Sequence, residues 1–317
     1  MGGDVKFVGD WFDRHKLVFG AEYRDDFEIS FHNDFGASQY SRTTASLYGE
    51  DEIGITDKWK LNVGGRYDQS SVSGVGGNLS PRVALIYSPI APTTIKASFG
   101  SAFRMPSAYE QFYHDATQIS NPNLGPEYVT TTELVLQHQF SREMRFTGSL
   151  YHYQTQDLIT NVTLPSSTLT ENINAGRSHT DGLELELERN WDNGVRFRGS
   201  YARQESIDSD GLHMVDSPEN LGKLNVTFPM LQNAVRTGIE VQATSARITE
   251  LRHTAGGYAV ANLTFSSEKS YDGLRGLFSI RNLFDRQYVS VAPAGMVQDT
   301  LPMDGRNVWF EVDYSFK

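Results

Sequence analysis

The chain has 317 residues, of which 38% are hydrophobic and 12% aromatic, with no cysteine and a formal net charge of −11. The negative charge argues against nucleic acid as a partner, since nucleic acids select basic surfaces, and the lack of cysteine excludes a disulfide scaffold and Cys-based metal sites. A mean hydropathy of −0.43 is typical of a soluble protein, but it leaves a transmembrane β-barrel open, because only alternate residues of such a strand meet lipid.

Segments rich in β-branched and aromatic residues, separated by turn residues, predict about fifteen strands without an interrupting domain linker. No stretch approaches the roughly 18 apolar residues of a membrane-spanning helix, and no unit repeats at a fixed period as in a propeller or solenoid. In chain order, strands are expected at residues 5–13, 17–26, 43–55, 60–68, 78–87, 94–103, 130–140, 145–153, 182–189, 195–203, 222–228, 236–244, 258–265, 276–284 and 307–316.

The connections between these strands alternate in length. Short turns are expected near residues 14–16, 56–59, 88–92, 141–144, 191–194 and 229–233. Longer polar segments are expected at residues 33–42, 105–127, 154–180, 205–220 and 286–304. Short turns at one rim and long loops at the other are typical of an outer-membrane barrel with periplasmic and extracellular ends.

The alternation of apolar and polar residues is clearest at residues 183–188, where the sequence is LELELE. In a membrane barrel the leucines would face lipid and the glutamates the lumen, whereas in a soluble sandwich the leucines would face a core. In the hairpin that follows, we expect Glu188 to pair with Arg196 and Glu186 with Arg198, because opposite charges across an antiparallel pair attract. Both ion pairs would face the lumen.

The last expected strand is apolar and aromatic on one face, and it ends on Phe316. Bacterial single-chain barrels close with an even number of strands. Fifteen strands, with the last one running towards the periplasm, therefore predict the C-terminal part of a larger barrel. Residues 1–6 lack the basic and apolar regions of a signal peptide, which leaves two interpretations: a protein that is not exported, or a fragment of one that is.

Several segments share their sequence and order with one family. They are residues 79–89 (LSPRVALIYSP), 95–107 (IKASFGSAFRMPS), 121–127 (NPNLGPE), 174–177 with 181–184 (NAGR and DGLE), 282–288 (NLFDRQY) and 305–306 (GR). Together they resemble the β-barrel half of a TonB-dependent outer-membrane receptor, over about residues 40 to 317. Each motif alone has low specificity, but the ordered set is specific.

The resemblance implies an all-β, antiparallel transmembrane β-barrel, with about 15 strands present here of the 22 in a receptor barrel. It implies a location in the outer membrane of a Gram-negative bacterium, in contact with outer-membrane lipid, and a transport function rather than an enzymatic one. The expected cargo is a small-molecule metal chelate, such as a ferric siderophore or haem, or a cobalamin-like ligand, with no resident cofactor. The expected protein partner is the TonB complex, which would act through an N-terminal region. We expect residues 1–317 to hold barrel alone, without plug domain, TonB box or signal peptide.

The candidate ligand-contact residues lie where a predicted strand leads into a long loop: Arg104, Tyr109, Tyr113 and His114. Aromatic side chains with a histidine could hold a siderophore or haem, and loops on a rigid scaffold are where binding residues concentrate. The structural alternative is an aromatic rim, with Arg104 paired to lumen carboxylates and Glu127 fixing the next strand.

Enzymatic and metal sites find little support in the sequence. The histidines are scattered without zinc-ligand spacing, and the acidic loop at residues 205–216 lacks the order of an EF-hand. Two other functions remain open. A passive porin-like channel would conduct without TonB, and a soluble carbohydrate-binding β-protein would bury its leucine faces in a core.

Overall fold

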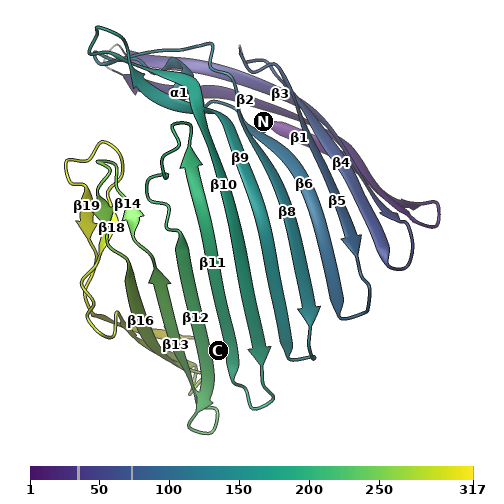
Figure 1. The fold of residues 1–317 in the computed structure, drawn as a ribbon, viewed down its shortest axis with the longest axis vertical. Helices are drawn as coiled ribbons and strands as arrows, with labels where there is room; N and C mark the ends of the chain where they lie inside the picture. The colour runs from purple at the N-terminus through teal and green to yellow at the C-terminus, as the bar shows by residue number, and fades with distance from the viewer. Residues whose placement is uncertain (34–35, 73, 317) are drawn as a thin grey trace. The chain divides into compact units, whose positions relative to one another are not determined.

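The computed structural model describes residues 1–33, 36–72 and 74–316. Fifteen strands follow one another in one hydrogen-bonded order, and most of them are labelled in Figure 1. A sixteenth strand, β7, pairs with β10 in parallel. The fifteen strands are β1 (Gly2–Trp11), β2 (His15–Asn33), β3 (Gly36–Gly54), β4 (Trp59–Ser70), β5 (Gly77–Tyr87), β6 (Thr93–Arg104), β8 (Glu127–Gln139), β9 (Met144–Thr163), β10 (Thr170–Asn190), β11 (Arg196–Asp208), β12 (Asn220–Met230), β13 (Val235–Thr244), β16 (Tyr258–Ser267), β17 (Leu274–Arg281) and β20 (Asn307–Tyr314).

The long connections contain small elements of their own. They are the helix α1 (Ala108–Phe112), the strand β7 (Gln118–Ile119), and the two-stranded ribbons β14 (Arg247–Ile248) with β15 (Thr254–Ala255) and β18 (Val289–Val291) with β19 (Thr300–Pro302). In the part of the chain that the structure describes, no helix is both long and apolar enough to cross a membrane. The prediction of an all-β antiparallel sheet of about fifteen strands is confirmed.

Two of the predicted long loops are wrong. The segment 154–180 is mostly strand, since β9 continues to Thr163 and β10 begins at Thr170. The segment 33–42 is also largely strand, because β2 ends at Asn33 and β3 begins at Gly36; residues 34 and 35 lie outside the described residues. Both segments are polar, which indicated a loop, yet their strands continue to pair. Thr155 and Ser178, for example, bond through their hydroxyls at 2.6 Å across β9 and β10.

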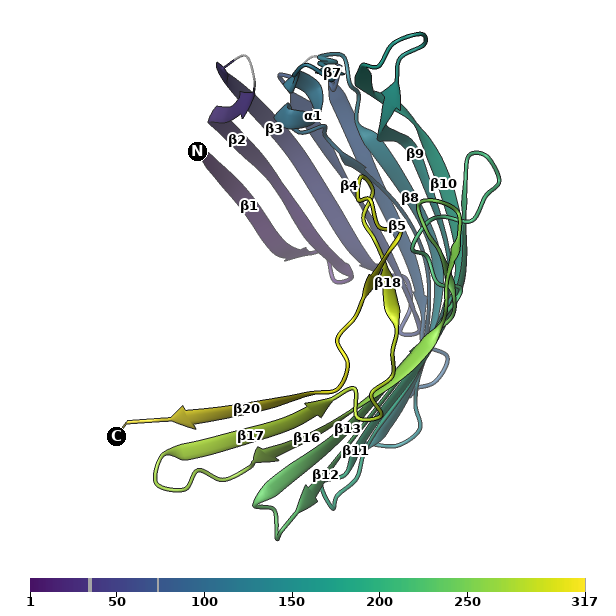
Figure 2. The same cartoon turned by 90° about the vertical axis from the view of Figure 1, so that its left-hand side faces the viewer.

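The chain divides into two compact units. Unit 1 contains Met1–Leu134, Tyr151–Thr180 and Asp208–Asp210, and unit 2 contains Val135–Leu150, Asp181–Ile207 and the chain from Gly211 onward. Within unit 1, the turns after β1, β3 and β5 lie at one end of the strands and α1 lies at the other (Figure 2). Within unit 2, the turns after β10, β12 and β16 share one end in the same way.

The strand register of unit 1 separates an apolar face from a polar one, because directly paired residues point to the same side of a sheet. The apolar face carries Val5, Phe7, Leu17, Phe19, Leu47, Leu61, Val63, Leu79, Val83 and Leu85. The polar face carries Glu22, Ser46, Glu50, Asn62, Arg66, Asp68 and Arg82, with Arg66 bonded to both Glu22 and Asp68 at 2.8 Å.

Unit 2 repeats this separation. Leu224, Val241 and Leu263 share one face, while Asn225, Glu240 and Asn262 share the other, with Asn262 bonded to Glu240 at 3.2 Å. Many of the large apolar side chains are exposed rather than enclosed in a core. A soluble β-protein would bury these side chains, whereas an apolar outer face is what a membrane strand presents to lipid.

Candidate ligand-binding site

Arg104, the last residue of β6, is the anchor of the segment that contains the predicted ligand-contact residues. Its guanidinium donates two hydrogen bonds of 2.9 Å to the carboxylate of Glu110 in α1. It donates a third, of 2.5 Å, to Glu127 at the start of β8. Arg104 therefore joins the end of one strand, the helix and the start of the next strand. This confirms the prediction that Arg104 pairs with carboxylates and that Glu127 fixes the strand.

Helix α1 begins with a capping box. The hydroxyl of Ser107 accepts from the backbone N–H of Glu110 at 3.2 Å, and the carboxylate of Glu110 accepts from the backbone N–H of Ser107 at 2.7 Å. Burial alone would raise the pKa of Glu110, but the hydrogen bonds from Arg104 and Ser107 and the charge of Arg104 lower it. Sequence analysis missed this helix, although Ser-x-x-Glu is a recognised signal for a helix N-terminus.

Hydrogen bonds fix the segment 104–127 internally and to β10. Gln111, 1% exposed, donates to the carbonyl oxygens of Pro122 and Leu124 at 3.4 and 3.3 Å. From β10, Asn172 donates to the carbonyl of Glu110 at 2.9 Å, and Asn174 exchanges hydrogen bonds of 2.8 and 3.0 Å with the backbone of Gly125. The segment 104–127 is thus a folded platform rather than an unstructured loop.

Aromatic rings cover this platform. Tyr109 and Tyr113 stack with ring centroids 4.4 Å apart, and Tyr109 is 52% exposed. Tyr40 of β3 stacks on Phe112 at 4.2 Å with the rings nearly parallel. Stacked aromatic rings on a fixed backbone offer a flat surface to a planar or apolar ligand at little cost in side-chain entropy.

The chain turns sharply after this aromatic surface, at Asp115. One carboxylate oxygen accepts from the backbone N–H and the hydroxyl of Thr117 and from the N–H of Gln118, at 2.6 to 2.8 Å, and the other accepts from the hydroxyl of Tyr113 at 3.0 Å. The bonds from Thr117 are the largest cause that lowers the pKa of Asp115 to about 2. Asp115 is therefore ionised at neutral pH and holds the Tyr113 ring in place.

The structure thus places the four predicted residues in one segment but in different settings. Tyr109 and Tyr113 are brought together as a stacked pair, Arg104 lies at the root of the segment, and His114 lies with its Nδ1 at 3.0 Å from the carbonyl oxygen of Phe112. Sequence analysis missed the residues that fix the platform: Ser107, Glu110, Gln111, Asn172 and Asn174. The capping pattern of Ser107 and Glu110 is visible in the sequence. Asn172 and Asn174, in contrast, contact the platform across more than forty residues of sequence.

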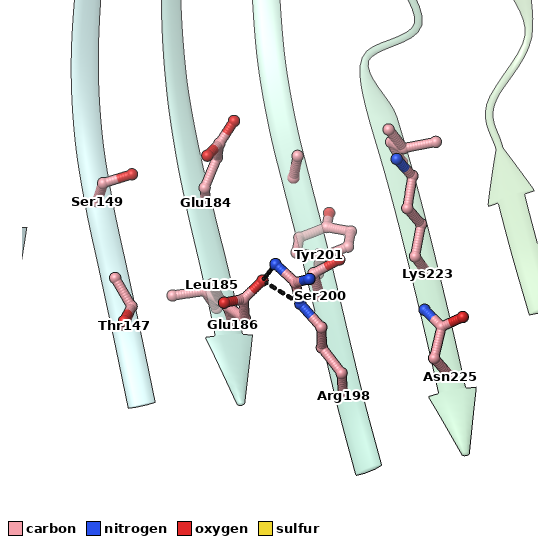
Figure 3. A pocket seen from close by; sticks show the side chains of 12 residues that line it. Thr147, Ser149, Glu184, Leu185, Glu186, Arg198, Ser200, Tyr201, Lys223 and Asn225 are labelled. Carbon is pink, nitrogen blue, oxygen red and sulfur yellow. Dashed lines mark hydrogen bonds and ion pairs between the residues drawn. The ribbon is translucent and has the colours of Figure 1, made fainter. Parts of the chain in front are cut away.

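A second polar site lies on the lumen-side face of unit 2. A cavity of about 420 Å³ is lined from β9, β10, β11 and β12 (Figure 3). Arg198 reaches across to Glu186, with Nε and Nη2 donating at 2.8 and 2.6 Å, while Glu184, Lys223 and Asn225 line the same space. Both charge signs and an amide here can interact with a polar solute.

One of the two predicted ion pairs is confirmed and the other is wrong. Glu186 pairs with Arg198 as expected. The arginine nearest to Glu188 is Arg145 of β9, at 2.5 Å, with Arg198 at 3.4 Å, rather than Arg196. Glu188 has neighbours on both sides in the sheet, and the hairpin alone could not decide between them. Among the described residues, no cluster of His, Cys, Asp or Glu is arranged to hold a metal ion.

Comparison with known proteins identifies the family. The family model described as "TonB dependent receptor-like, beta-barrel" matches residues 2–283. This chain belongs to that family. Its curated relatives include the "Iron-regulated outer membrane virulence protein" of Vibrio cholerae, 25% identical over 95% of this chain and 49% of the relative. Another is the "Ferrioxamine B receptor" of Salmonella typhimurium, 23% identical over 87% of this chain and 44% of the relative.

Solved structures show the same fold in the receptor family. The "Copper transporter OprC" has a TM-score of 0.77 at 19% identity, and the match covers 99% of this chain and 56% of the OprC chain. The FrpB iron transporter from Neisseria meningitidis has the same TM-score at 18% identity, covering 99% of this chain and 54% of its own. The chain spans about half the length of the curated relatives it matches. Its fold is that of an outer-membrane receptor barrel of Gram-negative bacteria, a family of transport receptors rather than enzymes.

Proposed function

We propose that this chain is the barrel portion of an outer-membrane receptor that takes up a scarce nutrient, a ferric siderophore, haem or cobalamin, with energy supplied through the TonB complex. The observation that carries the proposal is the match of residues 2–283 to the receptor-barrel family. Curated relatives named for iron regulation, ferrioxamine B and vitamin B12 support an iron chelate or cobalamin as cargo.

The platform of residues 104–127 is the proposed ligand contact. Tyr109 and Tyr113 present stacked rings on a backbone fixed by Arg104, Glu110 and Gln111. In this proposal His114 contributes a ring at the edge of the same surface, and Arg104 acts chiefly by holding the platform in place. A rigid aromatic surface loses little entropy when a large chelate binds.

Growth of an indicator strain tests this function. A Gram-negative host without its own siderophore, haem and cobalamin receptors would express the whole receptor that contains this barrel portion, with iron or cobalamin limiting. Each of a hydroxamate chelate, a catecholate chelate, haem and cobalamin would be supplied in turn. We expect one of these classes to restore growth in a host with TonB and not in a host without it. Equal growth in both hosts would instead establish a passive channel, and no growth with any class would refute the proposed cargo.

Two variants locate the contact. Tyr109→Ala combined with Tyr113→Ala removes the stacked rings, and we expect at least a tenfold higher ligand concentration for half-maximal growth. Tyr271→Ala is the matched control, because Tyr271 is 85% exposed at the turn between β16 and β17. If both variants behave like the parent protein, the ligand contact lies elsewhere in the receptor.

A further inference from the structure

The aromatic platform of residues 104–127 carries more negative than positive charge. The segment contains one arginine, Arg104, and three carboxylates, those of Glu110, Asp115 and Glu127. Both glutamates bind the guanidinium of Arg104, at 2.9 and 2.5 Å. Two negative charges therefore share the single positive one. With the histidine uncharged, the segment has a net charge of −2.

The third carboxylate, Asp115, is attached to the stacked rings themselves. Its Oδ2 accepts a hydrogen bond of 3.0 Å from the hydroxyl of Tyr113, whose ring stacks on Tyr109. Its Oδ1 accepts only from uncharged groups, the hydroxyl and N–H of Thr117 and the N–H of Gln118. Among the described residues no cationic side chain pairs with Asp115. An uncompensated negative charge therefore lies at the edge of the aromatic rings.

The charged groups around the platform do not offset this charge. Arg42 of β3 donates to the platform backbone at 3.5 Å, but its guanidinium also pairs with Asp26 at 3.0 Å. Asp26 is shared with Arg24, so these three residues have a net charge of +1. Glu171 of β10 pairs in register with β7, within the platform, and contributes −1. These neighbours cancel, and the negative charge of the platform remains.

We propose that the platform selects its ligand by charge: it accepts neutral or cationic ferric chelates of the hydroxamate class and rejects anionic chelates, with Asp115 as the specificity-determining residue. This inference rests on the proposed function, because it takes the stacked rings as the ligand contact. A ferric ion bound by three hydroxamates has no net charge, and a pendant ammonium group makes the complex cationic. A ferric ion bound by three catecholates is strongly anionic, and haem carries two carboxylates.

Shape alone does not separate these ligands. The flat rings of a catecholate chelate or of haem would stack on Tyr109 and Tyr113, and the methylene linkers of a hydroxamate chelate would pack on the same rings. Charge does separate them, because like charges that meet in an interface repel and suppress the wrong partner. The carboxylate of Asp115 therefore repels an anionic chelate and attracts an ammonium group.

One chelate in three charge forms tests this selection. A linear trihydroxamate with a terminal amine, loaded with radioactive iron, is cationic with the amine free, neutral when acetylated and anionic when succinylated. Binding would be measured on cells without TonB that express the whole receptor containing this barrel portion. We expect roughly tenfold tighter binding of the cationic than of the anionic form at low salt, and a smaller ratio at high salt, because salt screens exposed charges. Equal affinity for the three forms would overturn the proposal.

Asp115→Asn assigns the selection to one side chain. The amide keeps an oxygen for the N–H groups of Thr117 and Gln118 but removes the charge. We expect the neutral form to bind as in the parent receptor, and the ratio of cationic to anionic binding to fall about threefold. Weaker binding of all three forms by the same factor would show a structural role and overturn the assignment. Asp272→Asn, at the exposed turn between β16 and β17, is the matched control and should leave the ratio unchanged.

The failure of this inference is distinguishable from the failure of the proposed function. If none of the three forms binds while a catecholate chelate, haem or cobalamin supports TonB-dependent growth, the selection by charge is wrong and the proposed function stands. If no class of nutrient supports growth, the proposed function fails, and the inference fails with it.

Discussion

The platform that carries Tyr109 and Tyr113 depends on one carboxylate, and Glu110→Ala tests this dependence. The change removes the ion pair between Glu110 and Arg104, in which the Arg104 side chain is 50% exposed and the Glu110 side chain 25%. An ion pair this exposed contributes about 1 kcal/mol at most. It also removes half of the capping box, which contributes about 1 kcal/mol. Alanine returns a few tenths of a kcal/mol through its higher helix propensity. The expected net loss is about 1.5 kcal/mol of local stability.

Hydrogen exchange measures this loss. The amides of Gln111 and Tyr113 bond to the carbonyls of Ser107 and Tyr109 within α1, so their exchange reports the opening of the helix. A loss of about 1.5 kcal/mol corresponds to roughly tenfold faster exchange. The matched control is Glu143→Ala, an exposed carboxylate at the turn after β8. Unchanged exchange at both amides, or the same acceleration in the control, would refute the argument.

Two further predictions concern loops. Asp299 accepts from the hydroxyl of Thr249, the largest cause that lowers its pKa, and from the amide of Leu251. The stability contributed by ionised Asp299 is present above the ordinary carboxyl pKa of 3.8, and it is lost as the pH falls through the lowered pKa of Asp299. Hydrogen exchange at the Leu251 amide should therefore accelerate only in strong acid. Acceleration already near neutral pH would contradict this. In the second, Gly74→Ala should lower the melting temperature, because a Cβ at a φ of +80° would lie 2.8 Å from a backbone oxygen. Gly76→Ala, with a φ of +58° and open space around it, should cost only the backbone strain of about 1 kcal/mol, so equal melting of the two variants would refute the steric argument.

Much of this fold could be predicted from the sequence because the strand period is short and repeats. The two-residue alternation assigns each residue to a face without knowledge of its partner, so the polar and apolar faces of β10 and β11 were visible in advance. Pairing partners are a different matter. Glu188 lies between two neighbouring strands, and only the register of the whole sheet places Arg145 closer than Arg196.

The extent of the longest hairpin was less predictable for a physical reason. A strand that does not face lipid needs no apolar face. Polar side chains can then pair across it, as the hydroxyls of Thr155 and Ser178 do. Such a segment has the composition of a loop and the hydrogen bonding of a sheet. The platform of residues 104–127 illustrates the same limit, since Asn172 and Asn174 support it from β10 and no local pattern indicates this contact.

Charged residues at positions where the alternation calls for apolar ones carry information that the number of strands does not. His15 lies two residues before Leu17 on the apolar face of β2, and Asp51 lies between Gly49 and Ile53 on the same face of β3. A local rule broken at two places that meet in the structure at 2.7 Å is the pattern expected of a functional site rather than of random substitution. Had only Asp51 been present, its charge would stand unpaired beside lipid. His15 supplies a partner to Oδ2 of Asp51, but Oδ1 is buried without a hydrogen-bond partner among the described residues. An unsatisfied buried oxygen costs stability, so the stability of the sheet alone does not account for this pair.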